Sequence, residues 1–176
     1  MILWFRHLPQ LRMDLSEWTP FIQSHSLRKH FMKYVYLLQV IIFLIPFLFR
    51  GWFPHIDAFY LILLWFFVFL IHETLHIIVI NKKGDISLTF RGIFFWLHTN
   101  AILSKPRFWL FMSLPFLGLS VVPFIVSFFL SGELKSIFLF VSWINTLISA
   151  SDIINSLLIA VKPRNSVFCK GYYQLQ

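Results

Sequence analysis

Four long apolar runs divide the chain, and the shorter segments between them carry almost all of its charge. A helix needs about 20 apolar residues to cross the hydrocarbon core of a bilayer. The pattern therefore predicts an all-α membrane protein with four transmembrane helices, in which Pro115 and Pro123 bend the third. The four runs cover residues 34–49, Ala58–Ile80, 108–130 and 136–161.

The distribution of basic residues predicts how these helices are oriented. Of the 15 Lys and Arg residues, 13 lie before the first run, between the second and third, or after the fourth, and only Arg50 and Lys135 lie on the other side. The positive-inside rule then places both termini in the cytoplasm. Residues 34–161 form the membrane domain, residues 1–33 are an N-terminal interfacial segment rich in aromatic residues, and residues 162–176 are a cytoplasmic tail.

The segment between the second and third runs has the pattern of strands. Residues 85–90 alternate between polar and apolar, which is typical of a half-buried strand. Arg91 and Gly92 can turn the chain, and residues 93–99 can return as a second strand. We expect a short β-hairpin at the cytoplasmic interface, with an irregular interfacial loop as the alternative.

Composition supports a membrane location and excludes several other classes of protein. Hydrophobic residues make up 59% of the chain and charged residues 12%, against about 25% charged in an average soluble domain. The net charge of +8 is spread between the apolar runs, so we expect a lipid bilayer and no nucleic acid as the partner. The single cysteine, Cys169, excludes an intramolecular disulfide and a multi-cysteine zinc motif. The oligomeric state is left open.

The second run contains the strongest chemical signal, a His-Glu-Thr-Leu-His sequence that begins at His72. On a helix His72 and His76 share a face, so both imidazoles can reach one metal ion. Glu73 is rotated by about 100° from His72, and its carboxylate can approach a water at the metal without being a ligand. A carboxylate inside a transmembrane helix is expensive, which itself indicates a functional role.

A catalytic zinc site needs three protein ligands and one open position, and Asp152 meets the requirement for the third ligand. His72 lies nine residues before Asn81 and Asp152 lies ten before Lys162, where the two helices reach the same membrane face. Both side chains are therefore about 14 Å from that face. Asp152 also belongs to a polar stripe that runs along one face of a continuous fourth helix. The stripe consists of Ser142, Asn145, Ser149, Asp152 and Ser156.

The order of the four runs, the His-Glu-Thr-Leu-His sequence and the later Ser-Asp-Ile around Asp152 resemble the putative zincin peptidase family of small bacterial membrane proteins. That family is similar to the site-2 protease class of intramembrane metalloproteases. The resemblance implies one zinc ion held by His72, His76 and Asp152, Glu73 as the catalytic residue, and a bacterial cell membrane as the location. The sequence around Asp152 lacks the Pro and Gly that accompany the last ligand in site-2 proteases.

These observations predict a membrane-embedded zinc metalloprotease that hydrolyses peptide bonds of membrane-associated proteins or peptides. Zinc would lower the pKa of its bound water to about 7, and Glu73 would act as the general base. Asn145 is the first candidate for the donor that stabilises the oxyanion, with His98 second. The predicted hairpin could offer a strand edge to an extended substrate.

Two other functions fit the same residues. The chain could bind metal without catalysis, as a partner subunit of a transporter or peptide-export system. Alternatively, Glu73 and Asp152 could relay protons or ions in a carrier. Four helices without visible internal repeats make the carrier the weaker hypothesis.

Overall fold

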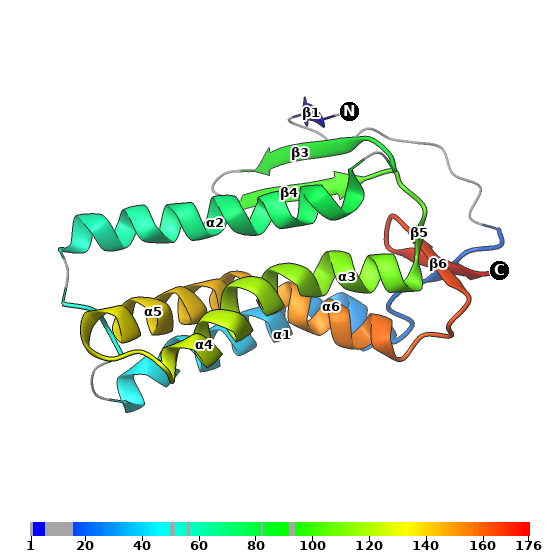
Figure 1. Cartoon of the computed structure of the whole chain (residues 1–176). Helices are drawn as coiled ribbons and strands as arrows, with labels where there is room; N and C mark the ends of the chain where they lie inside the picture. The colour runs from blue at the N-terminus through cyan, green and yellow to red at the C-terminus, as the bar shows by residue number, and fades with distance from the viewer. Residues whose placement is uncertain (1, 6–15, 50–51, 56, 82, 92–93) are drawn as a thin grey trace.

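The computed structural model describes residues 2–5, 16–49, 52–55, 57–81, 83–91 and 94–176. Most of the described chain is helical, with the helices packed lengthwise and short strands at one end and along one side (Figure 1). The helices are α1 (His25–Leu44), continued by a 3-10 turn (Ile45–Leu48); α2 (Ala58–Ile80); α3 (Lys105–Phe116), continued by a π-turn (Leu117–Val121) and α4 (Val122–Ser127); α5 (Gly132–Ile148); and α6 (Ala150–Ala160).

The helix boundaries follow local capping. Asp57 caps α2 by accepting a hydrogen bond from the backbone N–H of Phe59 at 2.8 Å, so α2 spans the same residues as the second apolar run. Ser24 accepts in the same way from Leu27 at 3.3 Å, and α1 therefore begins at His25, nine residues before the first apolar run. Polar residues at the start of α1 are compatible with a helix that extends beyond a membrane core.

Among the residues that the structure describes, three helical segments are long and apolar enough to cross a membrane, and the number rises to four if the bent pair α5 and α6 is counted as one span. The three are His25–Leu48, Ala58–Ile80 and Lys105–Ser127. Their outward faces carry many exposed large apolar side chains, including Leu37 at 58% and Phe59 at 62% exposure. Such broad apolar surfaces are typical of a membrane contact.

The expectation of one continuous fourth helix is wrong. Helices α5 and α6 are bent by 66° at Ser149, without a proline or glycine at the break. Ser149 leaves the helical conformation at φ −76° and ψ 5°, although its N–H still bonds to the carbonyl of Asn145 at 2.8 Å. The polar stripe is therefore divided between two helices, with Asp152 in the first turn of α6.

The first sheet contains the segment where the sequence predicts a hairpin. Strands β3 (Ile86–Arg91) and β4 (Phe94–Thr99) pair antiparallel, from Ile86 opposite Thr99 to Arg91 opposite Phe94. The N-terminal strand β1 (Ile2–Phe5) adds to β3 in parallel. The order is β1-β3-β4, so β4 is an edge strand of this sheet.

A second sheet lies outside the all-α description that the sequence suggested. Its antiparallel strands, in the order β2-β7-β6-β5, are β2 (Thr19–Pro20), β7 (Tyr172–Leu175), β6 (Ser166–Cys169) and β5 (Leu103–Ser104). The sheet joins both terminal segments to the start of α3. Strands of two to four residues are too short to show periodicity, and their partners are distant in sequence, so only the folded chain reveals them.

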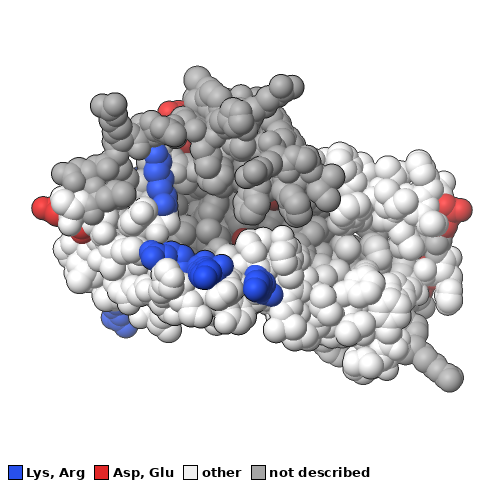
Figure 2. Space-filling view, turned by 180° about the vertical axis from the view of Figure 1, so that it is seen from behind, with Lys and Arg blue, Asp and Glu red and all other residues white. Residues whose placement is uncertain are grey.

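Two basic residues at the start of α3 connect the helices at this end. Lys105 Nζ donates to the carbonyl of Ala160 at 2.8 Å and to that of Lys162, at the end of α6. Arg107 Nε donates to the carbonyl of Val79 at 2.9 Å, at the end of α2. Cations at helix C-termini satisfy carbonyls that have no partner within the helix. The visible Lys and Arg side chains also gather toward this end of the molecule (Figure 2).

The base of the β3–β4 hairpin packs closely around Gly84. A Cβ atom added to Gly84 would lie 2.6 Å from Asn100 Oδ1 and 3.0 Å from Ala101 Cβ. Asn100 Oδ1 cannot retreat freely, because it accepts a hydrogen bond from the N–H of Asp85 at 2.8 Å.

Replacing Gly84 by Ala should therefore destabilise the fold by about 1–3 kcal/mol, as overpacking commonly does. The measurement is thermal unfolding of the purified protein in detergent micelles. Gly118→Ala is the matched control, because its new Cβ would meet only Leu75 Cδ1 at an ordinary 3.8 Å. Equal melting temperatures for the two variants would contradict the prediction.

Candidate metal centre

Helix α2 and the first turn of α6 bring three titratable side chains to one point inside the helix bundle. His72 and His76 are buried, with 2% and 5% of their surfaces exposed, and Asp152 is 9% exposed. His72 Nε2 lies 3.2 Å from Asp152 Oδ2, and His76 Nε2 lies 3.4 Å from the same oxygen. The two Nε2 atoms are 3.2 Å apart. The three atoms thus form an almost equilateral triangle.

This triangle fits a tetrahedral zinc ion. Bonds of about 2.0–2.1 Å in a tetrahedron place neighbouring ligand atoms about 3.3–3.4 Å apart. Two imidazole nitrogens and one carboxylate oxygen are also a donor set that catalytic zinc sites use, with the fourth position left open. Among the described residues, His72, His76 and Asp152 form a group that could hold a metal ion.

The hydrogen bond on the other side of His76 fixes its tautomer. His76 Nδ1 lies 2.7 Å from the backbone carbonyl oxygen of Phe111 on α3. A carbonyl only accepts, so Nδ1 carries the proton and donates. The Nε2 lone pair of His76 is then directed toward the other two ligand atoms, as metal binding requires.

A hydrogen bond to Asn145 fixes the tautomer of His72 in the same way. The amide Nδ2 of Asn145 donates to the carbonyl of Pro115 at 3.0 Å and lies 2.8 Å from Ser120 Oγ and 3.3 Å from Ser149 Oγ. Because a carbonyl accepts only from the NH₂ group, the amide orientation is determined, and Oδ1 faces His72 Nδ1 at 3.0 Å. His72 therefore also donates from Nδ1 and presents an Nε2 lone pair.

Three lone-pair donors within 3.4 Å repel one another unless a cation or a proton lies between them. The surrounding hydrogen bonds leave neither imidazole free to turn away. The bend at Ser149 contributes as well, since it places Asp152 at the start of α6, where the helix dipole stabilises a negative charge. The arrangement is therefore suited to a divalent cation.

The other two predicted site residues, Glu73 and His98, lie on α2 beside the ligands and on strand β4. Glu73 is half-buried on α2, close enough to interact electrostatically with His72, His76 and Asp152. The backbone of His98 pairs with Ser87 in the β3–β4 hairpin. The side chain of His98 lies outside the described residues, and its role as an oxyanion donor stays a prediction.

Sequence reasoning missed the contribution of α3. Pro115 was expected only to bend a helix, but its carbonyl and that of Phe111 each accept a hydrogen bond from the site. Ser120, in the π-turn, completes the surroundings of Asn145. The proline was the available signal, because a proline inside a helix always leaves one carbonyl without its regular partner.

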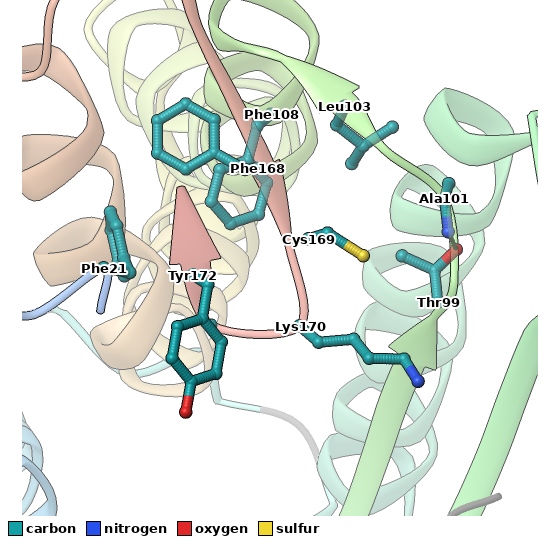
Figure 3. A pocket seen from close by; sticks show the side chains of 10 residues that line it. Phe21, Thr99, Ala101, Leu103, Phe108, Phe168, Cys169, Lys170 and Tyr172 are labelled. Atoms are coloured by element: carbon teal, nitrogen blue, oxygen red, sulfur yellow. Dashed lines mark hydrogen bonds between the residues drawn. The ribbon is translucent and has the colours of Figure 1, made fainter. Parts of the chain in front are cut away.

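A small cavity of about 40 Å³ lies at the strand end of the molecule, outside the ligand triad (Figure 3). Its wall is mainly apolar and includes Phe21, Phe108, Phe168 and Cys169. Burial raises the pKa of the Cys169 thiol, which makes this cysteine a poor nucleophile at neutral pH.

Comparison with known protein families gives one match. Residues 65–167 match the model of a family described as "Putative zincin peptidase". The matched region covers more than half of the chain and includes α2 from Trp65 onward, the hairpin, α3 and α6. No curated protein and no solved structure matches the chain.

Replacing Asp152 by Asn should weaken zinc binding by more than the roughly 10–100-fold that loss of a ligand's hydrogen-bond partner costs, because it removes the only anionic ligand of the triad. The affinity is measured by competition with a chromophoric chelator in detergent. Asp57→Asn is the control, since the Asp57 carboxylate is exposed at the start of α2. The assignment of Asp152 fails if both variants bind zinc as the wild type does.

Proposed function

The chain belongs to this zincin peptidase family, which indicates a zinc metallopeptidase, and we propose that it is a membrane-embedded protease with His72, His76 and Asp152 as its zinc ligands. One observation carries the proposal. Three lone pairs converge within 3.4 Å, and a hydrogen bond on the far side of each imidazole holds it in the metal-binding tautomer.

Zinc bound at this point would supply Lewis acidity, which polarises a scissile carbonyl and acidifies water. Glu73 is then the general base and acid: its carboxylate takes a proton from the attacking water and passes it to the leaving amine. The position of Glu73 beside the ligands, and its partial burial, support this role. Neither imidazole is available for proton transfer, because both Nδ1 protons are committed to Phe111 and Asn145.

We assign Asn145 to the orientation of His72. Asn145 is fully buried, and both ends of its amide are occupied by partners within the protein. A donor for the oxyanion needs a free N–H directed at the reacting carbonyl, so His98 is the better candidate for that task. The placement of His98 on edge strand β4 would bring it close to a peptide that pairs with this edge.

The substrates in this proposal are membrane proteins or membrane-associated peptides. The exposed apolar faces of α1 and α2 support immersion of the bundle in lipid, with the ligand triad at membrane depth. The basic residues gathered where α3 begins support an orientation with that end in the cytoplasm (Figure 2). A peptide bond reaches the site only after its helix unwinds, and edge strand β4 is suited to hold the extended segment.

Replacing Glu73 by Gln should leave about one zinc per chain and lower the rate of peptide hydrolysis by about 10²–10⁴-fold, the usual contribution of a general base. Zinc is counted by mass spectrometry of the purified protein, and cleavage is followed on membrane-anchored peptides in proteoliposomes. Glu133→Gln is the control, because Glu133 is exposed at the start of α5.

Each alternative function predicts a different result in the same experiment. Zinc in both proteins, without cleavage of any membrane-anchored peptide by the wild type, supports a non-catalytic metal-binding subunit. A wild-type protein that binds no zinc supports an ion relay through Glu73 and Asp152. Full activity of the Glu73→Gln variant contradicts the proposed mechanism.

Replacing Asn145 by Ala should lower zinc affinity about 10–100-fold, because His72 loses the acceptor that holds its ring. The same chelator competition measures the change. Asn165→Ala is the matched control, since Asn165 is exposed near the end of the chain and its amide donates to the carbonyl of Gln176. Unchanged affinity for Asn145→Ala would show that His72 is positioned by other contacts.

A further inference from the structure

Helix α3 contains a proline in its interior, at position 115, and this residue is fully buried. In a regular α-helix the N–H of residue 115 would bond to the carbonyl of Phe111, four residues earlier. Proline has no N–H, and its ring pushes that carbonyl away from the helix axis. The Phe111 carbonyl therefore needs a hydrogen-bond donor from outside the helix, since a buried carbonyl without a partner is costly.

The partner of this carbonyl is His76. The Nδ1–O distance is 2.7 Å, and the ring of Phe111 also packs against the imidazole, with 4.6 Å between ring centroids. The carbonyl of Pro115 itself accepts a second hydrogen bond, from the side-chain amide of Asn145 at 3.0 Å. Asn145 in turn accepts from His72 at 3.0 Å. The two ligand imidazoles are thus connected to two carbonyls of α3: His76 directly to that of Phe111, and His72 through Asn145 to that of Pro115.

We propose that Pro115 is a positioning residue for the His76 imidazole, because its missing N–H reserves the Phe111 carbonyl for His76. The inference rests on the proposed zinc site. With an N–H at position 115, the helix would compete for the Phe111 carbonyl, and His76 would lose the bond that selects its tautomer and fixes its ring. Pro115 therefore favours zinc binding because it has no N–H to compete with His76 for the Phe111 carbonyl.

The second proline of this segment separates this role from simple helix bending. Pro123, in α4, is also buried and also lacks an N–H, so the carbonyl of Leu119, four residues earlier, cannot bond to residue 123. Neither ligand imidazole can use the Leu119 carbonyl, because each Nδ1 is already bonded elsewhere and each Nε2 faces the triad. Pro123 is therefore a matched control for Pro115.

The test compares alanine with lactate at position 115, introduced by nonsense suppression into the full-length chain. Lactate has the side chain of alanine but an ester oxygen in place of the N–H. Pro115→Ala should lower zinc affinity about 10–100-fold and alter the absorption spectrum of the cobalt-substituted protein. The lactate variant should return both to wild-type values, and Pro123→Ala should leave both unchanged.

A second pair of variants leaves Pro115 in place. Replacing Met112 by its α-hydroxy acid turns the Phe111 carbonyl into an ester carbonyl, which is a weaker acceptor, and should also lower zinc affinity. The same replacement of Leu110 weakens the neighbouring Trp109 carbonyl and should have no effect on zinc. This pair keeps the inference testable if Pro115→Ala does not fold.

The outcomes separate the inference from the proposed function. Wild-type zinc binding with unchanged affinity in Pro115→Ala overturns the inference alone. Equal weakening by alanine and lactate also overturns it, because the proline ring and not the missing N–H would then be responsible. A wild-type protein without zinc overturns the proposed function and this inference together.

Discussion

The structure depends on keeping two imidazole lone pairs and a carboxylate oxygen in contact inside an apolar bundle. Three such groups within 3.4 Å repel one another unless a cation or a proton lies between them, and their burial removes the water that would otherwise separate them. Hydrogen bonds from Phe111 and Asn145 hold the imidazoles so that the lone pairs converge. A divalent cation would convert this repulsion into attraction, and for this reason the triad is a group that could hold a metal ion.

The helices that surround the triad are irregular at the points where polar contacts are needed. Pro115 frees a carbonyl in α3, the π-turn that follows contains Ser120, and the break at Ser149 sets the direction of α6. Within lipid, a backbone group released from a helix must find another partner in the protein. Here the released Phe111 carbonyl bonds to a ligand imidazole. The same irregularities that weaken the helices therefore build the site.

The outer surface of the bundle is apolar, whereas polar contacts connect the helices at one end. Large apolar side chains cover the outside of α1 and α2, whereas Lys105 and Arg107 join the ends of α6 and α2 to the start of α3. The second sheet ties both terminal segments to the same end through β2 and β7. The relative positions of the two helices that carry the ligands are thus set in part by contacts eight residues after Asp152 on α6 and three residues after His76 on α2.

The sequence alone determined the elements whose signal is local or periodic. Residues Ala58–Ile80 form one helix because a long apolar run has no other way to satisfy its backbone, and His72 and His76 share a face because 3.6 residues make a turn. Equal depth along two helices was enough to select Asp152 as the third member of the triad. The bend at Ser149, the second sheet and the hydrogen bonds from Phe111 and Asn145 were decided by the tertiary structure. Each of these depends on partners far apart in the chain, and no local pattern specifies which carbonyl a side chain will reach after the helices pack.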